Sequence, residues 1–278
     1  MSGTPWLRTP KRYVMFTLIG FLCIVTVYSL DFSGILNCVI AVGVSVIADH
    51  LYSYLIKKKR TFPDGSMITG MIIALILSTS TSWYVVSATA LISISSKYLL
   101  SYKKKPIFNP AAFGLLASLL LFRTGQSWWG AFGDLPAWTT ILLLVGGYWT
   151  VNRVNKFPMV FSYLGTTFVL LLIMGIVHFG DASDAFRSPF INATLFFALF
   201  MLTDPPTTPA KEKEQYIFGF LCSAVGVIIY GIFGGLMYLF IPLLIGNLYS
   251  MLSRSQWKHS YSNGGKQSEQ NGKRKSQV

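Results

Sequence analysis

Three short stretches of the sequence place polar side chains beside proline or glycine within otherwise apolar segments. They are PDGSMITG at residues 63–70, PIFNPAAFG at 106–114 and MLTDPPTTP at 201–209. Proline lacks a backbone donor and disfavours a helical conformation at the residue before it, so each stretch should begin or end a helix. Polar side chains at such breaks can satisfy the freed backbone groups or bind a polar ligand.

The first stretch carries the candidate residues Asp64, Thr69 and Gly70. Pro-Asp-Gly is typical of a turn and a carboxylate is favourable at a helix N-terminus, so we expect Asp64 to cap a helix that begins here. Thr69 shares a helix face with Ser66, and Gly70 permits close approach of another helix. The stretch therefore suits either helix packing or a ligand site.

The second stretch brackets Asn109 between two prolines, with Pro110 directly after it. Irregular backbone at membrane depth must be covered by protein or by a polar cavity, and the Asn109 amide offers that backbone two donors and an acceptor. The same groups suit a planar heterocycle with alternating donors and acceptors, such as a flavin ring. Both roles stay open at this point.

The third stretch places Thr203, Asp204 and Pro205 at the end of an apolar segment. An acid at a helix C-terminus opposes the helix dipole, so Asp204 needs another partner. Either a neighbouring loop or a ligand would serve.

Other polar and aromatic residues are weaker candidates. The pair Asp49–His50, near the end of an apolar segment, suits a proton relay or snorkelling to the interface. The pair Trp128–Trp129 is typical of an aromatic belt at the outer membrane interface. We expect no metal site, because the three cysteines sit singly within apolar segments, as small buried side chains, and the three histidines are dispersed. The sequence contains no nucleotide-binding or nucleophile motif, and we predict no catalytic residue.

The composition places these stretches in a membrane protein. The 278 residues are 53% hydrophobic and only 12% charged, against about 25% charged residues in soluble domains. The net charge of +13 would suit nucleic-acid binding if it were clustered, but the basic residues occupy short loops between apolar segments. The sequence therefore predicts a multi-pass protein of the lipid bilayer and no nucleic-acid partner.

The apolar segments predict an all-α fold of about ten transmembrane helices. Residues 1–12 and a basic, disordered tail at 253–278 are expected to flank this single transmembrane domain, residues 13–252. All Lys and Arg residues except Arg123 and Arg187 fall on the side of the N-terminus. The positive-inside rule then places both termini in the cytoplasm and the protein in the cell membrane. The expected helices cover approximately residues 13–30, 34–55, 66–80, 83–101, 108–122, 137–151, 159–178, 191–203, 216–230 and 233–252.

The third and eighth expected helices are short, at about 13 to 15 residues. Helices of that length cover only ~20–23 Å of a hydrocarbon core about 30 Å thick. They hold the same place in two five-helix halves, and an odd number of spans inverts the second half relative to the first. Short helices at matching positions of inverted repeats favour a binding site where they meet, near the membrane midplane.

Taken in order, DGSMITGMIIAL, PIFNPAAFG and FFALFMLTDPPTTP resemble one family of membrane proteins. Its members are flavin-carrying membrane proteins, RnfD of the Rnf ferredoxin:NAD complex and NqrB of the sodium-translocating NADH:quinone reductase. The resemblance spans about residues 62–225 and implies ten helices in two inverted halves, with flavins bound within the membrane. Matched to the family motifs, the flavin-site positions are Asp64, Thr69, Gly70, Asn109, Pro110, Thr203, Asp204 and Pro205.

The sequence departs from this family on the outer side. The resemblance implies FMN attached to a threonine in an S/T-G-A-T stretch, but the outer loop RTGQSWWGAFGD has no such threonine. Thr194, the alternative on that side, lacks the preceding glycine. We therefore expect riboflavin or FMN bound without a covalent link.

The resemblance predicts a membrane electron-transport subunit that binds a flavin and passes electrons across the cytoplasmic membrane, with coupling to ion translocation left open. Its partners would be other redox subunits or quinone, and whether the chain is itself an enzyme stays open. The alternative is a transporter or channel for a small polar solute that uses the same inverted-repeat fold.

Overall fold

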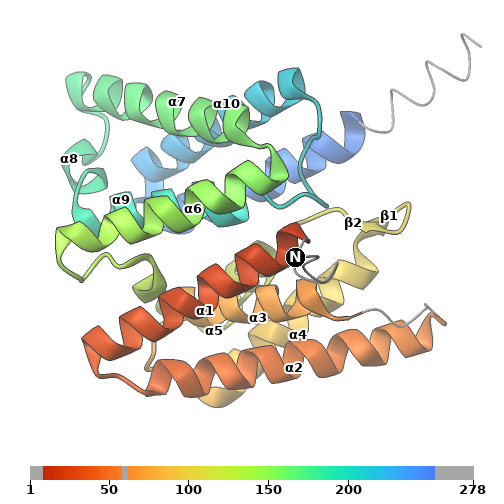
Figure 1. Cartoon of the computed structure of the whole chain (residues 1–278). Helices are drawn as coiled ribbons and strands as arrows, with labels where there is room; N and C mark the ends of the chain where they lie inside the picture. The colour runs from red at the N-terminus through yellow and green to blue at the C-terminus, as the bar shows by residue number, and fades with distance from the viewer. Residues whose placement is uncertain (1–8, 58–61, 254–278) are drawn as a thin grey trace, which may run out of the picture.

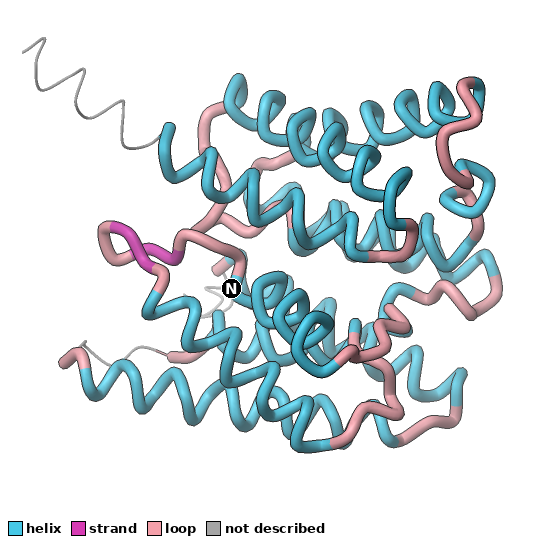
Figure 2. The backbone as a smooth tube through the Cα atoms, turned by 180° about the vertical axis from the view of Figure 1, so that it is seen from behind, coloured by secondary structure: helices cyan, strands magenta, loops and turns pink. Residues whose placement is uncertain are grey.

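The computed structural model describes residues 9–57 and 62–253; the expected basic tail and parts of the N-terminal segment and second loop lie outside these residues. The described chain is mainly helical (Figures 1 and 2), so the all-α prediction is confirmed. Its sheet is a small hairpin of β1 (Ser101–Tyr102) and β2 (Lys105–Pro106).

Each expected apolar segment contains a helix whose ends are shifted by only a few residues. In Figure 1 the elements from α1 to α5 form the lower part of the molecule, and those from α6 onward form the upper part. The helices are α1 (Pro10–Ser29), α2 (Ser33–Leu55), α3 (Asp64–Ile76), α4 (Trp83–Leu99), α5 (Pro110–Phe122), α6 (Thr140–Val154), α7 (Phe157–Ile176), the short α8 (Ala182–Ala185), α9 (Ser188–Phe196) with its π-helical continuation η4 (Phe197–Met201), α10 (Glu212–Phe233) and a final helix Met237–Ser253.

Helix length divides these elements into two groups. Among the described residues, α1, α2, α7 and α10 are long and apolar enough to cross a membrane. The third segment is short, as predicted, because α3 has 13 residues. However, α5 also has 13 residues, so short helices are not confined to the third and eighth positions.

The loop that follows α5 explains how α3 can end early. The backbone N–H groups of Ser127 and Trp128 both donate to the Ile76 carbonyl, and Ser78 N–H donates to the Gly125 carbonyl. These bonds satisfy the end of α3 inside the protein, as irregular backbone at membrane depth requires.

The same loop corrects the prediction for Trp128 and Trp129. Their exposed fractions are only 2% and 8%, so neither forms an interfacial aromatic belt. The Trp129 indole N–H donates to the Ala74 carbonyl at 2.7 Å. Its ring also fills space beside Gly34, where a Cβ would lie 2.3 Å from the indole. The two tryptophans therefore anchor the loop in the core. Of the cysteines, Cys38 and Cys222 are buried as predicted, but Cys23 is exposed.

Contacts among polar residues gather several basic side chains at one end of the bundle. Arg153, at the end of α6, donates to the Tyr13 hydroxyl at the start of α1. Lys97, at the end of α4, lies 2.6 Å from the Asp49 carboxylate of α2. The Lys156 ammonium, at the start of α7, donates to the Pro209 carbonyl. We call this end, which also carries the hairpin, the basic end.

Candidate functional site

Asn109 joins three elements at the start of α5. Its Oδ1 accepts a hydrogen bond from Ala112 N–H at 3.1 Å, which caps the helix, and Pro110 occupies the first helical turn. Its Nδ2 donates to the Met201 carbonyl at the end of η4, at 3.3 Å. The Asn109 side chain therefore connects the second sequence stretch directly to the third.

Asn247, in the final helix, completes this junction and was missed by the sequence analysis. Its Oδ1 accepts from the Asn109 backbone N–H at 2.8 Å, and its Nδ2 donates to the Thr207 carbonyl at 3.4 Å. The residue is fully buried. A lone amide within an apolar helix was the available signal, because a buried polar group requires a partner.

Asp204 organises the loop that follows η4. Its Oδ2 accepts from the Thr207 hydroxyl at 3.0 Å, and its carbonyl accepts from the Thr208 hydroxyl at 2.7 Å. Burial raises the pKa of this carboxyl above the ordinary value of 3.8, although the Thr207 hydrogen bond and the charges of Lys11, Lys156 and Lys97 act in the opposite direction. The Asp204 side chain thus bonds within its own loop, which Pro205 and Pro206 keep from continuing the helix.

The two predicted threonines bond to their own helices. The Thr203 hydroxyl donates to the Leu199 carbonyl at 2.8 Å, and the Thr69 hydroxyl donates to the Gly65 carbonyl at 2.9 Å. Their hydroxyl bonds therefore do not bring them together with Asn109. Gly70 serves helix packing, since a Cβ there would lie 2.7 Å from the Val42 Cα of α2.

The prediction that Asp64 caps α3 is wrong. The N-cap position belongs to Pro63, Asp64 is the first helical residue, and no side chain of the described residues makes a capping bond there. Within the described chain, Asp64 Oδ1 is buried without a hydrogen-bond partner. The carboxylate still lies in the first turn, where it interacts favourably with the helix dipole.

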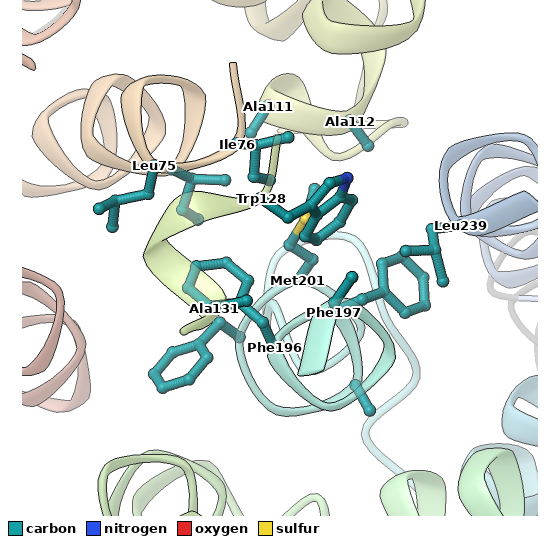
Figure 3. Close-up of a cluster of buried hydrophobic side chains, with 14 of the residues drawn as sticks. Leu75, Ile76, Ala111, Ala112, Trp128, Ala131, Phe196, Phe197, Met201 and Leu239 are labelled. Atoms are coloured by element: carbon teal, nitrogen blue, oxygen red, sulfur yellow. The ribbon is translucent and has the colours of Figure 1, made fainter. Parts of the chain in front are cut away.

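A buried aromatic cluster lies where the two halves meet (Figure 3). The Trp128 ring stacks on Phe240 of the final helix, with centroids 5.6 Å apart, and meets Phe196 edge-on. Figure 3 places Ala111 and Ala112, from the start of α5, and Met201, from η4, around the indole. Within the described chain, the buried Trp128 indole N–H has no hydrogen-bond partner. A buried donor without a hydrogen-bond partner destabilises the fold by about 1–3 kcal/mol, so a ligand that offers an acceptor at this position would bind more tightly.

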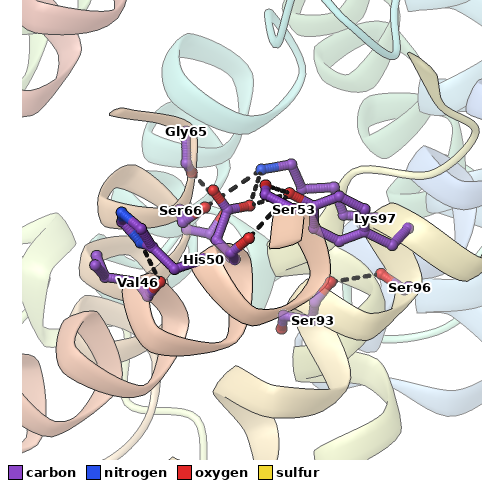
Figure 4. A network of polar contacts seen from close by, with 11 residues as sticks. Val46, His50, Ser53, Gly65, Ser66, Ser93, Ser96 and Lys97 are labelled. Atoms are coloured by element: carbon purple, nitrogen blue, oxygen red, sulfur yellow. Dashed lines mark hydrogen bonds and ion pairs between the residues drawn. The ribbon is translucent and has the colours of Figure 1, made fainter. Parts of the chain in front are cut away.

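A second polar network lies near the basic end, between α2 and α4 (Figure 4). Besides Lys97, the Asp49 carboxylate accepts from the Tyr98 hydroxyl at 2.8 Å, and the Lys97 ammonium also donates to the Ser66 hydroxyl of α3 at 3.3 Å. His50 does not join this network, because its Nδ1 contacts the Val46 carbonyl. The buried partner of Asp49 is therefore Lys97, and this pair connects α2, α3 and α4.

These contacts bring the second and third stretches together, whereas the first stretch belongs to α3, which packs against α1, α2 and α4. The junction of Asn109, Met201, Asn247 and the Asp204 loop joins elements from both halves of the chain. Its groups can hold a planar polar ligand by hydrogen bonds. They offer no nucleophile and, within the described residues, no group of side chains that could hold a metal ion.

The comparison with protein families gives two matches to one sequence profile. The profile of the NQR2, RnfD, RnfE family matches residues 7–135 and residues 122–252. The two matches together cover nearly the whole described chain, and each includes one of the two halves seen in the structure. No curated protein matches the chain.

Proposed function

Because the chain belongs to the NQR2, RnfD, RnfE family, we propose that it is a flavin-binding electron-transport subunit of a membrane redox complex. The family membership supports the general function of a membrane electron-transport subunit. The flavin, its position and the direction of electron transfer are the parts that we propose.

In this proposal the flavin ring binds at the junction of Asn109 with η4, beside Trp128. The supporting observation is the indole N–H of Trp128, which has no partner among the described residues and is buried in a site formed by the start of α5, η4 and the final helix. The acceptor atoms of an isoalloxazine ring would satisfy that donor, and the second N–H of the Asn109 amide adds another. The residues present therefore fit a planar heterocycle.

Each residue of the junction has a separate task in this proposal. Asn109 and Trp128 would bind and orient the ring. Asn247 would hold Asn109 in place by accepting a hydrogen bond from the Asn109 backbone N–H. The Asp204 loop would hold Asn247 through the Thr207 carbonyl. The bound flavin would supply the redox chemistry, while the protein sets its position and potential. No threonine of the S/T-G-A-T type is present, which supports a non-covalent flavin.

A repeated sequence pattern supports two inverted halves. PIFNPAAFG at 106–114 and YLFIPLLIG at 238–246 share phenylalanine, proline and glycine at matching positions. The two glycines also have matching surroundings. A Cβ on Gly114 would meet Ser93 of α4, and one on Gly246 would meet Cys222 of α10, so each glycine packs the fifth helix of its half on the fourth. The IIAL of α3 likewise matches the FFAL of α9 and η4.

The orientation that we propose has the basic end in the cytoplasm, which the positive-inside rule supports. Electrons would then enter or leave the site through partner redox subunits or quinone.

The variant Asn109→Ala tests the site. It removes the amide that we expect to bind the ring, so the purified full-length protein should lose most of its flavin absorbance while its helical circular dichroism and its elution from a sizing column stay unchanged. The matched control is Asn37→Ala. Asn37 is also a buried amide that donates to backbone carbonyls, those of Thr79 and Thr81, at the opposite end of the bundle.

The control should keep its flavin. Equal flavin content in the two variants would contradict the assigned site. A colourless wild-type protein that equilibrates a small polar solute across liposomes would instead favour the transporter alternative.

A further inference from the structure

A cavity of about 270 Å³ lies at the basic end, separate from the eight residues that the sequence predicted for the flavin site. The hairpin forms one side through Tyr102, Lys103 and Lys105, and Met251 of the final helix lines another. Thr207 and Asn247 form the polar part of its wall. We call this space the hairpin cavity.

The hairpin, magenta in Figure 2, has an unusual turn. The two turn residues, Lys103 and Lys104, have φ values of 49° and 65°, in the left-handed region that glycine and asparagine normally occupy. The strands hold this turn in place through the pairing of Ser101 with Pro106 and Tyr102 with Lys105. A hairpin turn made of lysines in this conformation is strained, and such strain often accompanies a functional site.

The charges in the hairpin cavity are all of one sign. Within residues 9–57 and 62–253, neither Lys103 nor Lys105 forms an ion pair, and no carboxylate lines the cavity. The Lys103 ammonium lies 4.7 Å from the centre of the Tyr102 ring. Asp204 accepts the hydroxyl of the cavity-lining Thr207 but does not itself line the cavity. The cavity therefore favours an anion at the lysines.

The remaining walls are apolar. Pro106 and Ile107 line the cavity on the hairpin side, and Met251 lines it on the final helix. A ligand that satisfies the whole cavity carries both a negative charge and an apolar chain. Basic pockets between transmembrane helices at the cytoplasmic surface bind anionic lipid headgroups for the same reason.

We propose that the hairpin cavity binds the phosphate of an anionic phospholipid headgroup. The phosphate lies between the ammonium groups of Lys103 and Lys105, and the attached acyl chain follows Ile107 and Met251 toward the bilayer. The two lysines of this site take no part in the junction at Asn109, so a change at them tests the lipid without removing a flavin contact. The cavity connects the lipid to that junction, however, because Asn247 lines the cavity and bonds to the Asn109 backbone.

The test uses full-length protein in detergent, titrated separately with phosphatidylglycerol, with phosphatidylcholine and with inorganic phosphate, and followed by native mass spectrometry and thermal unfolding. We expect phosphatidylglycerol to bind and raise the unfolding temperature more than phosphatidylcholine does. The double variant Lys103→Gln/Lys105→Gln should weaken phosphatidylglycerol binding about 25-fold, or roughly fivefold per lysine.

The matched control is Lys104→Gln/Lys213→Gln, which removes the same charge from residues that do not line the cavity. This control should bind phosphatidylglycerol as the wild type does. Equal weakening in both double variants, or no weakening in either, would overturn the proposal. Stabilisation by inorganic phosphate as large as that by phosphatidylglycerol would overturn it as well, since it would show an anion site with no lipid.

Discussion

At the scale of single residues, Asn109 illustrates why one polar side chain can serve both the fold and a ligand. Its side-chain Oδ1 caps α5, and one hydrogen of its Nδ2 bonds to the Met201 carbonyl. The second Nδ2 hydrogen is left for another partner. The sequence predicted the need for such a residue between two prolines. It could not show that Asn247 is the partner of Asn109, because the two residues are 138 positions apart.

The raised pKa of Asp204 predicts a specific dependence of stability on pH. The folded protein binds this proton more tightly than the unfolded chain, so stability should fall as pH rises from the ordinary value of 3.8 toward the raised folded value. Above that folded value the effect is constant. The variant Asp204→Asn should lack this part of the pH dependence.

Thermal unfolding of both proteins in detergent, at several pH values from acidic to neutral, measures the difference. Parallel curves for wild type and variant would contradict the assignment of the raised pKa to Asp204.

At the scale of helices, a substitution at Gly70 tests whether this residue serves the packing of α3 on α2. A methyl group there would lie 2.7 Å from the Val42 Cα and 2.8 Å from the Ala41 carbonyl, and backbone atoms cannot easily move. We expect Gly70→Ala to lower stability by about 1–3 kcal/mol through overpacking between α2 and α3.

Gly43→Ala is the control for this change, because a Cβ at Gly43 in α2 would meet no atom of residues 9–57 and 62–253 within 4 Å. Thermal unfolding of the two variants makes the comparison. If both variants unfold at the temperature of the wild type, the close contact of α3 with α2 is contradicted.

The pair of Asp49 and Lys97 predicts a non-additive response. Lys97→Met alone leaves a carboxylate with only 12% of its side chain exposed and without its cation, so we expect a loss of roughly 3 kcal/mol. Adding Asp49→Leu removes the unpaired charge and should restore most of that loss. A double variant as unstable as Lys97→Met would show that the pair does not act as one unit.

Helix positions were the part of the fold most accessible from sequence. Uninterrupted apolar segments and prolines located the ten expected segments, including the short α3, but not α8. The burial of Trp128 and Trp129 could not be predicted, because a tryptophan pair beside a glycine suits the membrane interface as well as it suits the protein core. Only the loop that folds back onto the Ile76 carbonyl shows that these rings enter the core. The Lys97 partner of Asp49 was missed for a similar reason, since it lies on another helix.

At the scale of the whole molecule, two matches to one family profile and the repeated F-x-P-x-x-x-G pattern describe a chain with two related halves. The halves differ where chemistry is expected. Asn109 of the first corresponds to Ile241 of the second, and Leu115 corresponds to Asn247. The two asparagines bond to each other across the halves, so the polar junction is a single site built from both.

The visible absorbance spectrum of the purified wild-type chain, produced in cells supplied with riboflavin, tests the central claim most directly. Our account predicts an oxidised flavin spectrum in stoichiometric amount, which dithionite bleaches and air restores. Protein that is folded and monodisperse but shows no flavin absorbance, even after incubation with riboflavin and FMN, would contradict it.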